Sequence, residues 1–138
     1  MLGLLILLAA QGVVAEDQAQ FDKAWAQIPP TQAEWPFSRD AAFDLYEWTQ
    51  AQFTLGYCSE FLPVADAARM RAFPNEQDLM QTRLGQGLIT TGHTNFYKGV
   101  AYRDKDKPDE ITCIQAMAGR GEKLKAITAP RNGSITKP

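Results

Sequence analysis

The stretch "RDAAFDLYEWTQAQFTLGYCSEFL", residues 39–62, decides the fold of this chain. Its apolar residues recur at steps of three, four and seven and make one stripe: Leu45, Trp48, Leu55, Cys58 and Leu62. Its polar residues fall on another side: Glu47, Gln50, Thr54 and Glu60. Several of these residue types favour strands, but the spacing is that of an amphipathic helix, and periodicity outranks propensity. We predict one long helix, capped by Ser38 and ended by Pro63.

The segment before this helix contains a shorter amphipathic helix. Phe21, Trp25 and Ile28 lie at positions i, i+4 and i+7, which places them on one face, and Pro29 follows directly. A short polar connection separates this helix from Ser38. Residues 16–37 are therefore interpreted as an N-terminal extension with a short helix, and the sequence leaves open whether the extension packs on the rest of the chain.

Two further helices are expected after Pro63. Residues 64–73 predict a short helix that stops before Pro74, and Asn75 is expected to cap another helix. Gly85, Gly87 and Gly92 lie inside that second helix, where each glycine costs up to about 1 kcal/mol relative to alanine. Either another backbone packs closely at these glycines or the helix kinks near them.

The C-terminal part predicts a loop and one last helix. Residues 103–110, "RDKDKPDE", combine Pro108 with dense charge and predict a loop. The last helix is indicated by apolar spacing at Ile114, Met117, Gly121 and Leu124. We therefore expect an all-α fold, a small helical bundle of four or five helices with one disulfide. Residues 38–128 would form this helical domain, and residues 129–138 a flexible tail.

The first fifteen residues, "MLGLLILLAAQGVVA", carry no charged side chain. As a helix they would reach only about 22 Å, whereas a bilayer core is about 30 Å thick. Small residues follow the apolar run, as they do before a signal-peptidase site. Residues 1–15 are therefore predicted to be a secretory signal peptide, which makes the protein periplasmic or secreted. The alternatives are an N-terminal core helix and an uncleaved membrane anchor; we expect no stable membrane insertion of the mature chain.

The chain has two cysteines, Cys58 and Cys113. In an exported protein an even number of cysteines indicates disulfides, and two cysteines allow only one intramolecular pairing. Closing a loop of about 55 residues would contribute roughly 4 kcal/mol in the chain-entropy model. The alternative is a pair of free, buried thiols, and the choice depends on export.

Charge and motifs exclude several classes of function. The chain has 14 basic and 16 acidic side chains, a net charge of −2, which provides no electrostatic basis for binding nucleic acid. No haem-attachment motif and no phosphate-binding glycine loop occur, so no cofactor is expected.

Catalytic and metal sites are also disfavoured. His93 is the single histidine and is interpreted as structural or exposed, so no catalytic residue is assigned. Residues 104–115 lack the Gly and Glu that an EF-hand loop needs at its sixth and twelfth positions, because Asp109 and Gln115 stand there. No metal site is expected. Paired carboxylates brought together only by folding remain an open alternative.

The sequence is rich in aromatic residues at helical spacing: Trp25, Trp35, Tyr46, Trp48 and Phe53. This pattern is typical of a core, but the same residues could line a pocket for an apolar small molecule. The protein would then be a periplasmic carrier or sensor. An apolar cavity of several hundred Å³ would favour that function, and a solid core would count against it.

The stretch "FYKGVAYRDKDKPDEITCIQAM", residues 96–117, resembles a segment of the Tai-type immunity proteins. The shared pattern is an aromatic residue, Gly-Val or Gly-Ile, a variable loop and Cys followed by an aliphatic residue. The matching positions are Phe96, Gly99, Val100, Cys113 and Ile114. Gln115 stands where the family often has Pro. The resemblance covers about twenty residues strongly and implies a small helical periplasmic protein that neutralises a peptidoglycan amidase delivered by type VI secretion.

Our leading hypothesis is a non-catalytic, exported protein-binding module, such as an immunity or inhibitor protein for an envelope-targeting effector. Gly99 would allow close packing and Cys113 would fasten the far side, so the charged loop between them would be held at both ends. Such a loop loses less conformational entropy on binding. The predicted partner-binding residues are the charged positions of this loop: Asp104, Lys105, Asp106, Lys107, Asp109 and Glu110.

Overall fold

The computed structural model describes residues 17–27 and 29–129. Six α-helices and one 3-10 turn follow a first helix at residues 17–27, here called the N-terminal helix. They are α2 (Arg39–Cys58), η1 (Ser59–Phe61), α3 (Val64–Arg71), α4 (Glu76–Leu79), α5 (Arg83–Asp106), α6 (Glu110–Met117) and α7 (Arg120–Thr128). The all-α prediction is confirmed, but there are more helices than the expected four or five. The predicted signal peptide and all but the first residue of the predicted tail lie outside the described residues.

The additional helices arise because two expected helices are each divided. The helix expected from Asn75 ends at Leu79, and α5 begins anew after Thr82, whose hydroxyl accepts a hydrogen bond from the Gly85 amide. Asn75 is the N-cap residue of α4, as predicted, but it adopts a left-handed conformation (φ 62°) and its side chain makes no capping hydrogen bond. The expected last helix is interrupted at Gly119 (φ 77°), which separates α6 from α7.

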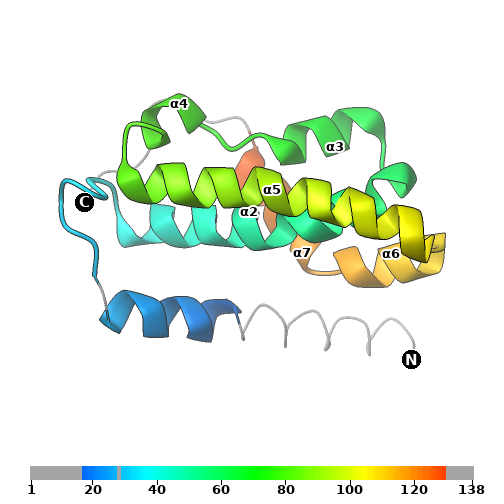
Figure 1. Cartoon of the computed structure of the whole chain (residues 1–138), viewed down its shortest axis with the longest axis horizontal. Helices are drawn as coiled ribbons and strands as arrows, with labels where there is room; N and C mark the ends of the chain where they lie inside the picture. Colours follow the sequence, from blue (N-terminus) through cyan, green and yellow to red (C-terminus); the bar gives the residue numbers. More distant parts are fainter. Residues whose placement is uncertain (1–16, 28, 130–138) are drawn as a thin grey trace.

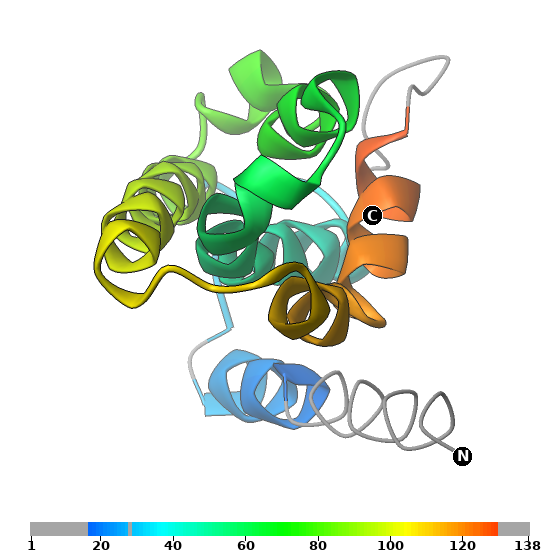
Figure 2. The same cartoon turned by 90° about the vertical axis from the view of Figure 1, so that its right-hand side faces the viewer.

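Helix α2 is the central helix of the structure. Figure 2 shows it surrounded by α3, α5, α6, α7 and the N-terminal helix. The Ser38 hydroxyl accepts a hydrogen bond from the Ala41 amide (3.1 Å), which confirms the predicted cap. The apolar stripe is buried as predicted along α2, whereas Leu62 is only half-buried because the α-helix ends at Cys58. Glu47, which was placed on the polar side, is in fact only 5% exposed.

Helices α2 and α5 run side by side in the same direction, and the chain returns between them through α3 and α4 (Figure 1). Their backbones are in direct contact: a Cβ at Gly56 would lie 2.1 Å from the carbonyl oxygen of Phe96. At Gly92 a Cβ would lie 2.2 Å from the Trp48 ring. Close packing therefore explains Gly92, around which α5 is continuous, whereas Gly85 lies directly after the interruption between α4 and α5, where a Cβ would lie 2.1 Å from the Leu79 carbonyl oxygen.

The N-terminal extension packs on the rest of the chain. The Phe21 ring lies 5.0 Å from that of Phe43 and 5.6 Å from that of Tyr46, and Phe21 belongs to the same core cluster as the α2 stripe. Trp35 is buried, and its indole nitrogen donates a hydrogen bond to the Ser38 carbonyl oxygen (2.8 Å). No helix within the described ranges is both long and apolar enough to cross a membrane.

Candidate protein-binding surface

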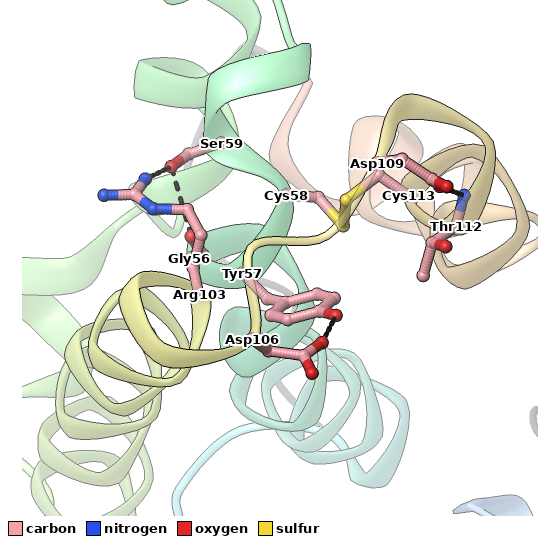
Figure 3. Close-up of a disulfide and its surroundings, with 9 residues drawn as sticks. All are labelled: Gly56, Tyr57, Cys58, Ser59, Arg103, Asp106, Asp109, Thr112 and Cys113. Carbon is pink, nitrogen blue, oxygen red and sulfur yellow. Dashed lines mark hydrogen bonds between the residues drawn. A yellow bond between two sulfur atoms is a disulfide. The ribbon is translucent and has the colours of Figure 1, made fainter.

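The disulfide joins the end of α2 to α6. Cys58 is the last residue of α2 and Cys113 lies in the middle of α6, with their Cα atoms 5.4 Å apart (Figure 3). Both side chains are buried. The predicted pairing therefore agrees with the structure, but the bond fastens α6 and not a single last helix. The charged segment that connects α5 to α6 lies next to this covalent link.

The charged segment is not the long loop that the sequence predicted. Asp104, Lys105 and Asp106 form the last turn of α5, and Glu110 is the first residue of α6. Only residues 107–109 are non-helical. The loop is short because Lys107 ends α5 in a left-handed conformation (φ 50°), with its amide bonded to the Arg103 carbonyl oxygen, and because Asp109 caps α6 directly afterwards.

The predicted partner-binding residues lie together at this end of the molecule, and we call them the charged rim: Asp104, Lys105, Asp106, Lys107, Asp109 and Glu110. All are exposed. Some of them already have partners: the Asp109 carboxylate accepts a hydrogen bond from the Thr112 amide (2.7 Å), and Asp106 accepts one from the Tyr57 hydroxyl. The side chains of Lys105, Lys107 and Glu110 make no hydrogen bond or ion pair with any described residue, so they are available to a partner.

Three aromatic side chains, Phe53, Tyr57 and Tyr102, form a continuous cluster beside the charged rim, here called the aromatic surface. The Tyr57 ring centre lies 6.5 Å from that of Phe53 and 5.7 Å from that of Tyr102. Phe53 is 38% exposed and Tyr102 is 51% exposed. The cluster combines residues of α2 and α5 that are more than forty positions apart in the chain.

Hydrogen bonds and charge link the aromatic surface to the rim. The bond to the Asp106 carboxylate, reinforced by partial burial, raises the pKa of Tyr57 to about 12, so the phenol stays protonated and can donate. The hydrogen bonds from Thr112 hold the pKa of Asp109 below its usual value. Arg103 fastens the end of α5 to η1, because its guanidinium donates a hydrogen bond to the Ser59 hydroxyl (2.8 Å) and lies 3.7 Å from the Glu60 carboxylate.

Sequence reasoning did not place the aromatic surface at the candidate site. Phe53 was interpreted as part of the core or of an apolar pocket, and Tyr57, one helical turn further along α2, was not singled out. Tyr102 follows Gly99 by three residues, and the close approach of α2 and α5 at Gly99 brings it to Tyr57. The glycines in the sequence indicate that another helix packs closely against α5. They do not indicate which helix this is, and the identity of that helix determines which aromatic side chains meet.

His93 has a structural environment. Its ring nitrogen lies 2.9 Å from a Glu76 carboxylate oxygen, and its ring packs edge-on against Trp48 with centres 5.4 Å apart. This contact joins α5 to α4. Within the part of the chain that the structure describes, no three or more His, Cys, Asp or Glu side chains are grouped closely enough to hold a metal ion.

Folding does bring two carboxylates together. Asp17 of the N-terminal helix and Glu47 of α2 are both buried. Burial, and then the charge of Asp17, raise the pKa of Glu47 to about 7, while Lys123 and Arg120 oppose this shift. Arg120 pairs with Asp17 at 3.2 Å. The cavity beside Glu47 has a volume of about 10 Å³, which is room for about one water molecule and none for a sugar ring.

Comparisons with known proteins find no relative: no protein-family model, no curated protein and no solved structure matches this chain.

Proposed function

We propose that this protein binds a second protein through the aromatic surface and the charged rim. The observation that supports the proposal is the cluster of Phe53, Tyr57 and Tyr102, whose rings contact one another and are partly exposed. Protein interfaces are enriched in aromatic residues at their centre and have a polar rim that water can reach. Tyrosine is among the residues that most often dominate binding energy.

The surface is rigid before a partner arrives. The aromatic side chains project from two long helices whose backbones are in contact at Gly56 and Gly99. The disulfide holds α6 against the end of α2, and Arg103 holds the end of α5 to η1. A surface that is ordered in advance loses little conformational entropy on binding, and more of its contact energy then appears as affinity.

The partner class that we propose is an envelope-targeting effector enzyme, which the protein would inhibit without catalysing a reaction. The resemblance of residues 96–117 to the Tai-type immunity proteins supports this class, and that segment contains Tyr102 and the whole charged rim. Export to the periplasm, predicted from residues 1–15, would place the protein in the compartment where such an effector acts.

Affinity capture from envelope extracts, quantified by mass spectrometry, tests the proposal. Tyr102→Ala should reduce the yield of the captured partner by about tenfold or more, the effect of losing a dominant interface tyrosine. Tyr97→Ala is the matched control: Tyr97 is 62% exposed on the same helix but packs near Phe96 and Arg71, outside the aromatic surface. Equal yields from the two variants would contradict the proposed surface.

A further inference from the structure

An apolar groove lies on another part of the molecule, between the N-terminal helix, α2 and the start of α5. Its free volume is about 310 Å³, and its walls are almost wholly apolar. The residues that define it are Phe21, Trp25, Tyr46, Leu84, Leu88 and Glu34. None of them belongs to the aromatic surface or the charged rim, so the groove is independent of the protein-binding proposal.

Specific contacts hold the walls of the groove in place. The Tyr46 hydroxyl donates a hydrogen bond to the Gln20 side-chain oxygen (3.3 Å), and Asp22 pairs with Arg39. Both contacts join the N-terminal helix to α2. On the opposite side, the Leu84 amide donates a hydrogen bond to the Glu34 carbonyl oxygen (3.4 Å), which fixes the connecting segment to the start of α5. Specific contacts between the surrounding segments therefore maintain the shape of the groove.

The volume of the groove sets the size of a ligand. A cavity of about 150 Å³ lined by apolar side chains binds benzene. This groove, at about 310 Å³, has roughly twice that room, and it falls at the lower end of the range of small-molecule sites, about 300–1,000 Å³. A ligand with an apolar part of about ten carbon atoms fits this volume.

Charge sets the chemistry of the ligand head group. Glu34 is the single carboxylate among the groove residues, and burial raises the pKa of the other ionisable residue, Tyr46, which therefore stays neutral. One Glu34 oxygen accepts a hydrogen bond from the Thr31 hydroxyl (3.0 Å), and the other makes no hydrogen bond to any described residue. The nearby cation Arg39 is already paired with Asp22, and its guanidinium lies over the Phe21 and Trp25 rings, 5.1 Å and 6.0 Å from their centres. A cationic head group would therefore find an available carboxylate oxygen at Glu34.

We propose that the groove binds an apolar amine: a small molecule with a hydrophobic body packed between Trp25, Tyr46 and Leu88 and an ammonium group beside Glu34.

Titration calorimetry of the full chain with decylamine, decanol and decanoate tests this proposal, because the three probes share a chain and differ only in their head group. Decylamine should bind at one site per chain and about fivefold more tightly than decanol, the upper range for a partly exposed ion pair. Decanoate should bind most weakly. Equal or tighter binding of decanoate would overturn the assignment of the amine head, and absence of binding by all three probes would overturn the site.

Variants locate the binding. Glu34→Gln should remove the preference for decylamine over decanol and leave the affinity for decanol unchanged. The control Glu122→Gln, on α7 away from the groove, should leave both the preference and the affinity for decanol unchanged. Ala24 is exposed and lines the groove, so Ala24→Phe should block all three probes by filling it; Ala24→Leu serves if the larger side chain prevents folding. Unchanged binding to a folded Ala24 variant would show that the probes bind elsewhere, and the proposal would then be wrong.

Discussion

Gly56 of α2 and Gly99 of α5 face each other's helix at the point where the two backbones touch. A Cβ at Gly56 would lie 2.1 Å from the Phe96 carbonyl oxygen, and a Cβ at Gly99 would lie 2.0 Å from the Phe53 carbonyl oxygen. No side chain larger than hydrogen fits at either position unless the helices separate. This mutual approach is what places Phe53 and Tyr57 beside Tyr102.

The helix contact predicts opposite effects for two glycine substitutions in α5. Gly99→Ala should lower the free energy of unfolding by about 1–3 kcal/mol, because the new methyl group meets backbone atoms that cannot move aside without shifting a helix. Gly87→Ala should raise it by up to about 1 kcal/mol, since a Cβ at Gly87 would meet nothing within 4 Å. Urea unfolding under oxidising conditions measures both; a stabilised Gly99→Ala variant would refute the close contact.

The disulfide should contribute strongly to stability. The double variant Cys58→Ala, Cys113→Ala should lose roughly 4 kcal/mol of unfolding free energy, the chain-entropy contribution of closing a loop of about 55 residues. Denaturant unfolding of the oxidised protein and the double variant gives this difference. Thiol labelling of the denatured protein, read by mass spectrometry, should find no free thiol before reduction and two afterwards; two free thiols in protein folded under oxidising conditions would contradict the bond.

Buried Glu47 should make stability fall as pH rises. Its pKa is about 7 in the folded protein and 4.5 in the reference state, so between these values the folded protein binds more protons than the unfolded chain. The unfolding free energy should therefore decrease from about pH 4.5 to pH 7, by roughly 2 kcal/mol.

Glu47→Gln isolates this effect because glutamine has the same shape and does not ionise. The variant should match the parent protein near pH 5 and be the more stable of the two at pH 8. Glu122→Gln, an exposed carboxylate on α7, is the control and should follow the parent at both pH values. If the Glu47→Gln difference is the same at pH 5 and pH 8, the raised pKa is not present.

The charged rim should govern the rate at which a partner associates. The triple variant Asp104→Ala, Asp106→Ala, Lys107→Ala should weaken the complex chiefly through a slower association rate with altered salt dependence, because rim charges steer encounter more than they add affinity. Circular dichroism should be almost unchanged, since all three side chains are exposed and the Arg103 bond to Ser59 still fastens the last turn of α5 when the Tyr57 bond to Asp106 is lost.

Surface plasmon resonance with the captured partner measures this effect. The control triple, Asp78→Ala, Glu122→Ala, Lys125→Ala, removes the same net charge from exposed positions outside the rim and should leave association unchanged. Equal rates for the two triples would remove the charged rim from the binding mechanism.

Local pattern was sufficient for several elements of this structure. The stripe from Leu45 to Cys58, the Ser38 cap and the short helix before Pro74 all follow from interactions within a few residues, and each was predicted correctly. The pairing of Cys58 with Cys113 was also predictable, because two cysteines allow a single intramolecular bond. These features depend on helical periodicity and on the number of cysteines, both of which can be read from the sequence without the tertiary structure.

Long-range packing decided the features that local pattern did not predict, namely the burial of Glu47 and the extent of α5. Glu47 is polar by type and by position on its helix, yet it is buried because the N-terminal helix and α7 both pack over that side of α2. Dense charge suggested a loop from Asp104 to Glu110, but α5 extends to Asp106 because its last turn is fastened to α2 and η1 through Tyr57 and Ser59.

By itself, the sequence determined that this chain is helical, where its longest buried face lies and which cysteines can join. Only the tertiary structure decided which side chains become neighbours, and so created both the aromatic surface and the apolar groove. The physical reason is range: helix formation depends on residues three and four positions apart, whereas each site is assembled from segments that meet only when the helices pack.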